Sequence, residues 1–258
     1  CTLFGRYVTS MKVSIITVTY NSAQTLAHTM DSIANQTYPN IEHIIIDGAS
    51  TDGTIDIIKQ RQDRVAYFIS EPDRGIYDAL NKGLDKATGD IIGLLNSDDV
   101  FADNRIIELI VKRFEHKQCD VVYGNLVYQS QCPNKNKVFR YWKSNRFDPK
   151  CLKYGWMPPH PTLYCRKKVY DEVGHFDTTF RISADYDFAL RVFGNLDYKT
   201  SHLPAVLVRM NVGGVSNGSF RNIICKMTED YKVLKKNHIG SFFTLGCKNM
   251  RKLMQFIR

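Results

Sequence analysis

The strongest constraint on the fold of this chain is a fourfold alternation of strand and helix patterns over residues 12–95. Runs of β-branched and other apolar residues at 12–19, 41–46, 65–69 and 91–95 alternate with segments in which apolar residues recur at helical spacing. The strand runs are almost continuously apolar, which is typical of strands buried on both faces. Four successive strand–helix units predict an α/β fold with a doubly wound, mostly parallel sheet and right-handed crossovers.

Polar side chains follow the ends of these predicted strands. Tyr20 follows the first strand, Asp47 ends the second, residues 71–74 follow the third, and Asp98 and Asp99 follow the fourth. Ligands of doubly wound sheets bind at the carboxyl ends of the strands. The sequence therefore predicts a polar ligand site at this edge of the sheet.

Asp98 and Asp99 are adjacent carboxylates just after a buried strand. Carboxylate oxygens suit a hard divalent cation that also binds phosphate oxygens. The same pair is equally compatible with a solvated acidic turn that caps the next helix. The pair alone leaves both interpretations open.

The other polar residues at this edge are also open to two interpretations each. Asp47 either accepts a hydrogen bond from the N–H of a nucleotide base or bonds the backbone of its own turn. Arg74 either pairs with a diphosphate or base, or with a neighbouring carboxylate.

The second half of the chain is less regular. Its patterns predict helices at 103–117 and 184–193, strands at 121–128 and 198–210, a loop or loose hairpin at 129–153, and two closing helices within 222–258. Asp185 and Asp187 fall at the start of a helix, where the helix dipole stabilises carboxylates. A carboxylate there could equally serve as a general base. His160, between two prolines, is either a rigid surface residue or a contact for a second substrate.

The net charge of +9 is concentrated in two segments, 135–153 and 231–258. The second carries seven Lys or Arg residues, no acidic residue, and interleaved aromatic and aliphatic residues. This pattern predicts either a helix lying on an anionic membrane or a basic amphipathic helix packed on the domain. No apolar run approaches the roughly 18 residues of a membrane span.

The seven cysteines lack metal-ligand spacing, which favours reduced thiols in a cytosolic protein.

Five motifs occur in an order and spacing that resemble those of the family 2 glycosyltransferases, and within them the bacterial enzymes that assemble O-antigen, capsule or colanic acid repeat units. The resemblance runs from about residue 11 to 216. The motifs are 13–21 (VSIITVTYN), 45–54 (IIDGASTDGT), 71–83 (EPDRGIYDALNKG), 89–99 (GDIIGLLNSDD) and 183–187 (SADYD).

The resemblance implies a GT-A fold with C-terminal helices. Residues 11–220 would form the catalytic domain, with a nucleotide-binding half at 11–100 and an acceptor half at 101–220. Residues 221–258 would form basic amphipathic helices, and residues 1–10 an extraneous or disordered leader. The implied activity is metal-dependent, inverting hexosyl transfer from a nucleotide sugar, expected to be a UDP-sugar, to a glycan hydroxyl. A polyprenyl-diphosphate-linked acceptor would place the cytoplasmic enzyme peripherally on the inner face of the cytoplasmic membrane.

The resemblance also implies a role for individual residues. Asp98 and Asp99 would hold Mg²⁺ or Mn²⁺, Asp185 would be the catalytic base, and Asp187 would only start the helix. Many relatives carry Asp where this chain has Asn96, which can bond a hydroxyl but brings no charge. The residues expected to bind the nucleotide sugar are Thr17, Tyr20, Asp47, Arg74, Asn96 and Asp98, and those expected to contact the acceptor are Trp156 and His160.

Two other classes of function compete with this one. A sugar-phosphate nucleotidyltransferase would need a glycine-rich, basic phosphate loop after the first strand, and residues 19–22 (TYNS) are unlike one. A non-enzymatic nucleic-acid-binding protein is supported by the positive charge alone, because no nucleic-acid motif accompanies it. We therefore expect no nucleic-acid partner.

Overall fold

The computed structural model describes residues 10–129, 138–211 and 220–255. Three of the segments discussed above fall partly outside these ranges. They are residues 1–9 of the expected leader, 135–137 of the first basic segment, and 256–258 of the basic tail. Residues 212–216, at the end of the family resemblance, also lie outside the described residues.

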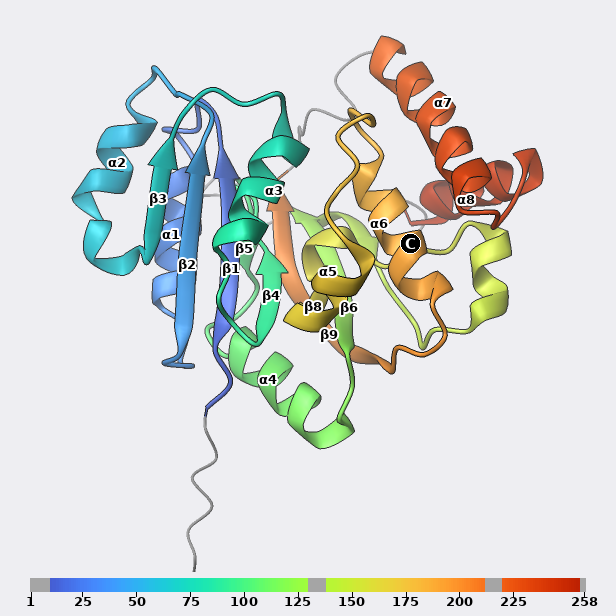
Figure 1. Ribbon diagram of the computed structural model, residues 1–258, viewed down its shortest axis with the longest axis horizontal. Coiled ribbons are helices and arrows are strands. Elements are labelled where there is room, and N and C mark those ends of the chain that lie inside the picture. Colours follow the sequence, from blue (N-terminus) through green and yellow to red (C-terminus); the bar gives the residue numbers. More distant parts are fainter. Residues whose placement is uncertain (1–9, 130–137, 212–219, 256–258) are drawn as a thin grey trace, which may run out of the picture.

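The N-terminal half alternates strands and helices as predicted. The central strand β1 pairs in parallel with β2 on one side and β4 on the other, and β2 pairs in parallel with β3. Figure 1 shows these four strands side by side, with their carboxyl ends at one edge. The elements are β1 (Val13–Thr19), α1 (Leu26–Ala34), β2 (Ile41–Asp47), α2 (Thr54–Gln60), η1 (Gln62–Arg64), β3 (Tyr67–Ser70), α3 (Ile76–Lys86) and β4 (Ile91–Leu94).

The C-terminal half extends the same sheet, in the order β3-β2-β1-β4-β8-β6-β9-β5, with β7 paired to β6. Strands β6 and β9 are parallel, whereas β8 joins β4 and β6 in antiparallel fashion. Its elements are β5 (Val100–Phe101), α4 (Ile106–Lys117), β6 (Val121–Gln129), β7 (Val138–Trp142), η2 (Pro149–Tyr154), η3 (His160–Thr162), β8 (Tyr164–Arg166), α5 (Lys167–Val173), α6 (Ala184–Gly194), β9 (Thr200–Asn211), α7 (Phe220–Lys236) and α8 (Phe242–Met254).

Helices cover both faces of the sheet, as a doubly wound fold requires. On β1, Ile16 and Val18 face a core shared with α3, α5 and α6, whereas Val13 and Ile15 face a second core built with α4. All seven residues of β1 are buried. This two-sided burial explains why the strand is a continuous apolar run.

Helices α7 and α8 stand beyond α6, at the end of the molecule far from α1 and α2 (Figure 1). Val233 and Leu234 of α7 and Leu245 of α8 belong to the same core as α6. The two predicted closing helices are therefore packed on the domain. None of the helices in the described ranges has the length and apolar character needed to cross a membrane.

Candidate active site

The loops that follow β1, β2 and β4 are bonded to one another at the carboxyl edge of the sheet. Asn21 adopts a left-handed backbone (φ 48°), and its N–H donates to the hydroxyl of Ser50 over 2.8 Å. The hydroxyls of Ser22 and Ser97 lie 2.9 Å apart and join the first loop to the fourth. The Tyr20 ring is 64% exposed at this edge. The edge is thus a rigid platform with one accessible aromatic ring.

Asp47 and Thr17 support this platform from inside. The Asp47 carboxylate is fully buried and accepts hydrogen bonds from the Ser50 N–H (2.9 Å) and from the hydroxyls of Ser50 and Ser70. The Thr17 side chain is also fully buried, with its hydroxyl 3.0 Å from Nε2 of His43. Asp47 thus shows the second arrangement considered for it, bonded within its own turn, and neither side chain is exposed.

Arg74 shows the second of the two arrangements considered for it. Its guanidinium donates to Asp78 one helical turn away, over 3.1 Å, and is 84% exposed. An exposed pair of this kind is held only weakly. The Arg74 side chain is therefore available to exchange one anionic partner for another.

The acidic pair lies between β4 and β5 and has the strongest electrostatic signature in the site. Burial, with the neighbouring Asp98 charge, raises the pKa of Asp99 well above its usual range. Burial likewise raises the pKa of Asp98. One oxygen of Asp99 accepts from the Asn96 amide over 3.2 Å, while Oδ1 is buried with no hydrogen-bond partner among the described residues.

An orphaned, buried carboxylate oxygen beside a second carboxylate fits a divalent cation, because a cation supplies the positive charge that the surroundings lack. Within the described ranges, no group of three or more His, Cys, Asp or Glu residues could hold a metal.

Asp185 occupies the first turn of α6 and is partly open to solvent, with 22% of its side chain exposed. Its Oδ1 accepts from the N–H of Tyr186 (2.8 Å) and lies 3.2 Å from the hydroxyl of Tyr77. Its Oδ2 lies 3.1 Å from Nδ1 of His160. The carboxylate is thus oriented by neighbours on three separate segments while remaining accessible.

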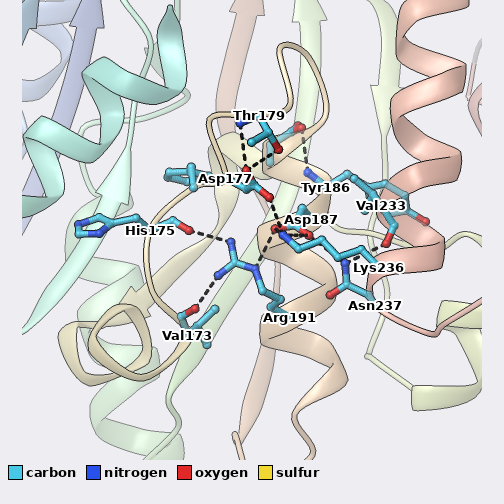
Figure 2. Close-up of polar contacts among 12 residues, drawn as sticks. Val173, His175, Asp177, Thr179, Tyr186, Asp187, Arg191, Val233, Lys236 and Asn237 are labelled. Carbon is cyan, nitrogen blue, oxygen red and sulfur yellow. Dashed lines mark hydrogen bonds and ion pairs between the residues drawn. The ribbon is translucent and has the colours of Figure 1, made fainter. Parts of the chain in front are cut away.

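Asp187, two residues further on, has a different environment. It is fully buried and bonds Nε of Arg191 (2.9 Å), Nζ of Lys236 (3.1 Å) and the amide of Asn237 (2.9 Å). Figure 2 shows these side chains converging on Asp187 from α6 and α7. Asp187 is therefore a packing residue that joins the two helices.

Tyr128, on β6, lies under the guanidinium of Arg140, 4.8 Å from its ring centre. Burial raises the pKa of the Tyr128 phenol; the Arg140 charge opposes this shift, and the charges of Asp99 and Asp185 add to it.

The expected acceptor contacts differ from each other. Trp156 is buried, donates its indole N–H to Asn145 over 3.0 Å, and packs edge-on against Tyr123 and Phe193. The ring is thus part of the core and offers no stacking face, contrary to the sequence-based expectation. His160 is one-third exposed and contacts Asp185.

Sequence reasoning missed the residues that hold the loop before α6. The Glu229 carboxylate accepts from three successive backbone N–H groups, those of residues 181–183, over 2.8–3.0 Å. Asp230 accepts from the hydroxyl of Ser183 and pairs with Lys248 of α8, each over 2.8 Å. Residues 181–183 and their partners Glu229 and Asp230 lie 46 or more residues apart, and no local pattern connects them.

Comparison with known proteins assigns the class. The sequence profile of "Glycosyl transferase family 2" matches residues 14–182. Because the match covers more than half of the chain, the chain belongs to this family. It is 32% identical over 209 residues to a PGL/p-HBAD biosynthesis glycosyltransferase of Mycobacterium tuberculosis, covering 79% of this chain and 78% of that protein. It is 29% identical to the uncharacterized glycosyltransferase YwdF of Bacillus subtilis, covering 77% and 73%.

Solved structures confirm the expected GT-A fold. Staphylococcus aureus TarS 1–349, in complex with UDP-GlcNAc, superposes with a TM-score of 0.70 at 19% identity, covering 88% of this chain and 65% of that one. A mannosyltransferase from Pyrobaculum calidifontis, in complex with GDP-Man and Mn²⁺, superposes with a TM-score of 0.65 at 18% identity, covering 96% and 72%. In a structure of a longer form of TarS, the matched region spans only 39% of the length of that protein.

Proposed function

We propose that this glycosyltransferase moves a sugar from a nucleoside-diphosphate sugar, expected to be a UDP-sugar, to a glycan hydroxyl with inversion at the anomeric carbon. The observation that carries the proposal is the contrast between two carboxylates, one after β4 and one at the start of α6. Asp99 is buried and lacks a partner for one oxygen, whereas Asp185 is oriented and partly open. The first suits cation and diphosphate binding, and the second suits proton transfer.

Asp98 and Asp99 would hold Mg²⁺ or Mn²⁺, with Asn96 orienting Asp99. When bound, such a cation neutralises the charge that grows on the leaving diphosphate. The bound nucleotide sugars of TarS and of the Pyrobaculum enzyme, the latter with Mn²⁺, support this assignment by analogy of fold. Tyr20 would contact the nucleotide from the exposed edge, and Arg74 would turn from Asp78 towards the diphosphate.

Asp185 would accept the proton of the attacking hydroxyl, which approaches the anomeric carbon from the side opposite the diphosphate. A single displacement of this kind inverts the stereochemistry. A positioned base contributes on the order of 10²–10⁴ in rate. Asp185→Asn should therefore reduce transfer by at least about a hundredfold.

The test is to measure transfer and nucleotide binding separately in Asp185→Asn. We expect transfer to be nearly lost while the Kd for UDP with Mn²⁺, measured by calorimetry, stays within about threefold of wild type, because Asp185 lies on the acceptor side. More than about a tenth of wild-type turnover in the variant would rule out Asp185 as the base. Retained stereochemistry in the product would rule out single displacement.

We further propose that the acceptor is a lipid-linked glycan used in bacterial surface polysaccharide synthesis, and that the enzyme docks on the inner leaflet through α8. The support is an exposed apolar face on α8, in which Phe242, Phe243, Met250, Leu253 and Met254 are each more than 60% exposed. Lys232 and Lys235 are exposed on the adjoining helix α7, and their positive charge suits an anionic membrane surface.

Co-sedimentation with vesicles containing anionic lipid tests the docking. The wild-type chain should partition more strongly than a Met250→Ser/Leu253→Ser/Met254→Ser variant, and salt should weaken the binding. Because these three side chains are exposed, the variant should melt close to the wild-type temperature. Equal partitioning of the two proteins would exclude this face as the membrane contact.

A further inference from the structure

We propose that His160 is a positioning residue for the reaction, holding the Asp185 carboxylate by donating Nδ1–H to Oδ2. The inference deepens the proposed function and rests on Asp185 being the base. It assigns His160 to the base itself, in place of the direct acceptor contact expected from the sequence. The geometry behind it is a 3.1 Å separation between Nδ1 and Oδ2.

The backbone that carries His160 is rigid. Pro159 and Pro161 flank it, so both neighbouring φ angles are restricted. The short helix η3 is closed by the Thr162 N–H donating to the Pro159 carbonyl (2.9 Å), and the Thr162 hydroxyl accepts from the Gly124 N–H of β6 (3.2 Å). The imidazole is thus carried by a segment bonded to the sheet.

The hydrogen-bonding capacity of the two side chains determines which nitrogen bears the proton. Burial lowers the pKa of His160, Asp185 opposes this shift and Lys226 reinforces it, so the ring is neutral at pH 7 with one N–H. A carboxylate oxygen only accepts hydrogen bonds. The single proton therefore resides on Nδ1, which faces Asp185, and Nε2 carries the lone pair.

Tyr77 cannot replace this contact. Its hydroxyl has one proton and lies 2.7 Å from the Ile182 carbonyl and 3.2 Å from Oδ1 of Asp185, both of which only accept. The hydroxyl proton is therefore directed at the closer acceptor, the Ile182 carbonyl. In the described part of the chain, His160 is therefore the one side chain whose donor is committed to Asp185, and it alone bonds Oδ2.

Losing this bond should misorient the base without changing the donor site. With Oδ2 released, the carboxylate is held only through Oδ1, by the Tyr186 N–H and the longer contact with the Tyr77 hydroxyl, and it can rotate about its terminal bond. A misplacement of about 1 Å in a reacting group can reduce the rate about a hundredfold. The loss should appear in kcat, with the KM for the nucleotide sugar unchanged, because the bond is made on the acceptor side.

Substitution of His160 by asparagine, glutamine or alanine distinguishes a role of Nδ1 from a role of Nε2. The asparagine amide nitrogen mimics Nδ1, whereas the longer glutamine amide mimics Nε2. We expect His160→Ala and His160→Gln to lower kcat by roughly 10–100-fold, with donor KM and UDP Kd within about twofold. His160→Asn should keep kcat within about fivefold of wild type, because it restores the donor to Oδ2.

His175 supplies a matched control. Its Nε2 lies 2.9 Å from Oδ1 of Asp85, a similar imidazole–carboxylate contact, but both side chains are more than half exposed and lie outside the site. His175→Ala should leave kcat unchanged. The Tm of each variant, measured with and without UDP, shows whether a loss of activity is caused by unfolding. A variant that only misplaces Asp185 should keep the wild-type Tm and its increase with UDP.

Rescue by Gln and not by Asn would show that Nε2 is the functional atom, and would overturn the proposal. Full activity of His160→Ala would also overturn it. The double variant Asp185→Asn/His160→Ala separates this inference from the proposed function. If His160 acts through Asp185, the alanine adds no further loss to Asp185→Asn. An additive loss means that His160 acts independently, whereas a fully active Asp185→Asn refutes the base assignment itself.

Discussion

Replacing Asp187 with asparagine tests whether two aspartates separated by one residue have distinct roles. The change keeps the shape of the side chain and removes a fully buried negative charge from between Arg191 and Lys236. Removing one partner of a buried ion pair typically costs about 3–5 kcal/mol. Both cations keep other acceptors here: Arg191 bonds two backbone carbonyls, and Lys236 bonds Asp177 over 2.7 Å.

These remaining bonds place the expected loss at the lower end, about 3 kcal/mol in the free energy of unfolding. For a chain of this size the loss corresponds to a fall in Tm of roughly 6–12 °C. Urea unfolding followed by circular dichroism measures it, with Asp185→Asn as the matched control. The control should unfold within about 1 kcal/mol of wild type because its side chain is partly exposed.

The folded fraction of Asp187→Asn, assayed well below its Tm, should retain kcat within about tenfold of wild type, whereas the control should not. The reasoning fails if Asp187→Asn is as stable as wild type but inactive. It also fails if Asp185→Asn loses the larger share of stability. Either result would make Asp187 the functional carboxylate.

Three further predictions concern other polar groups. Glu229→Gln should lower kcat and cost about 1–3 kcal/mol of stability, because the amide nitrogen would face backbone N–H donors. A wild-type kcat in this variant would show that the loop before α6 does not need the Glu229 carboxylate. Asp99→Asn should abolish Mn²⁺-dependent transfer yet raise the metal-free Tm, because burial and Asp98 raise the pKa of Asp99 and the ionised form costs stability at pH 7; a lower Tm would contradict this. Burial lowers the pKa of His43 to about 3. The free energy of unfolding should therefore decrease as the pH is lowered below about 6.5, by up to about 1.4 kcal/mol per pH unit. His43→Gln should flatten this slope between pH 6.5 and 5, and an unchanged slope would exclude His43 as its source.

Local patterns in the sequence were sufficient for the sheet and for the edge that carries the site. Apolar periodicity reports whether a segment is a strand or a helix, and the polar residues after each strand mark the carboxyl edge. The positions of α4, α6 and β9 and the two closing helices were predictable in this way. The GT-A class was instead implied by the resemblance of five motifs to the family 2 glycosyltransferases. The three-residue strand β8 was missed, because a segment so short has no measurable period.

The partners of each functional side chain depended on the tertiary structure. Trp156 was expected at the acceptor and lies in the core, because its exposure is decided by Tyr123 and Phe193, which come from other segments. Asp185 and Asp187 look alike in sequence, and only the packing of α7 against α6 buries one and leaves the other open. Sequence patterns report period and local polarity. Contacts between segments tens of residues apart depend on strand register and side-chain packing, which exist only once the chain has folded.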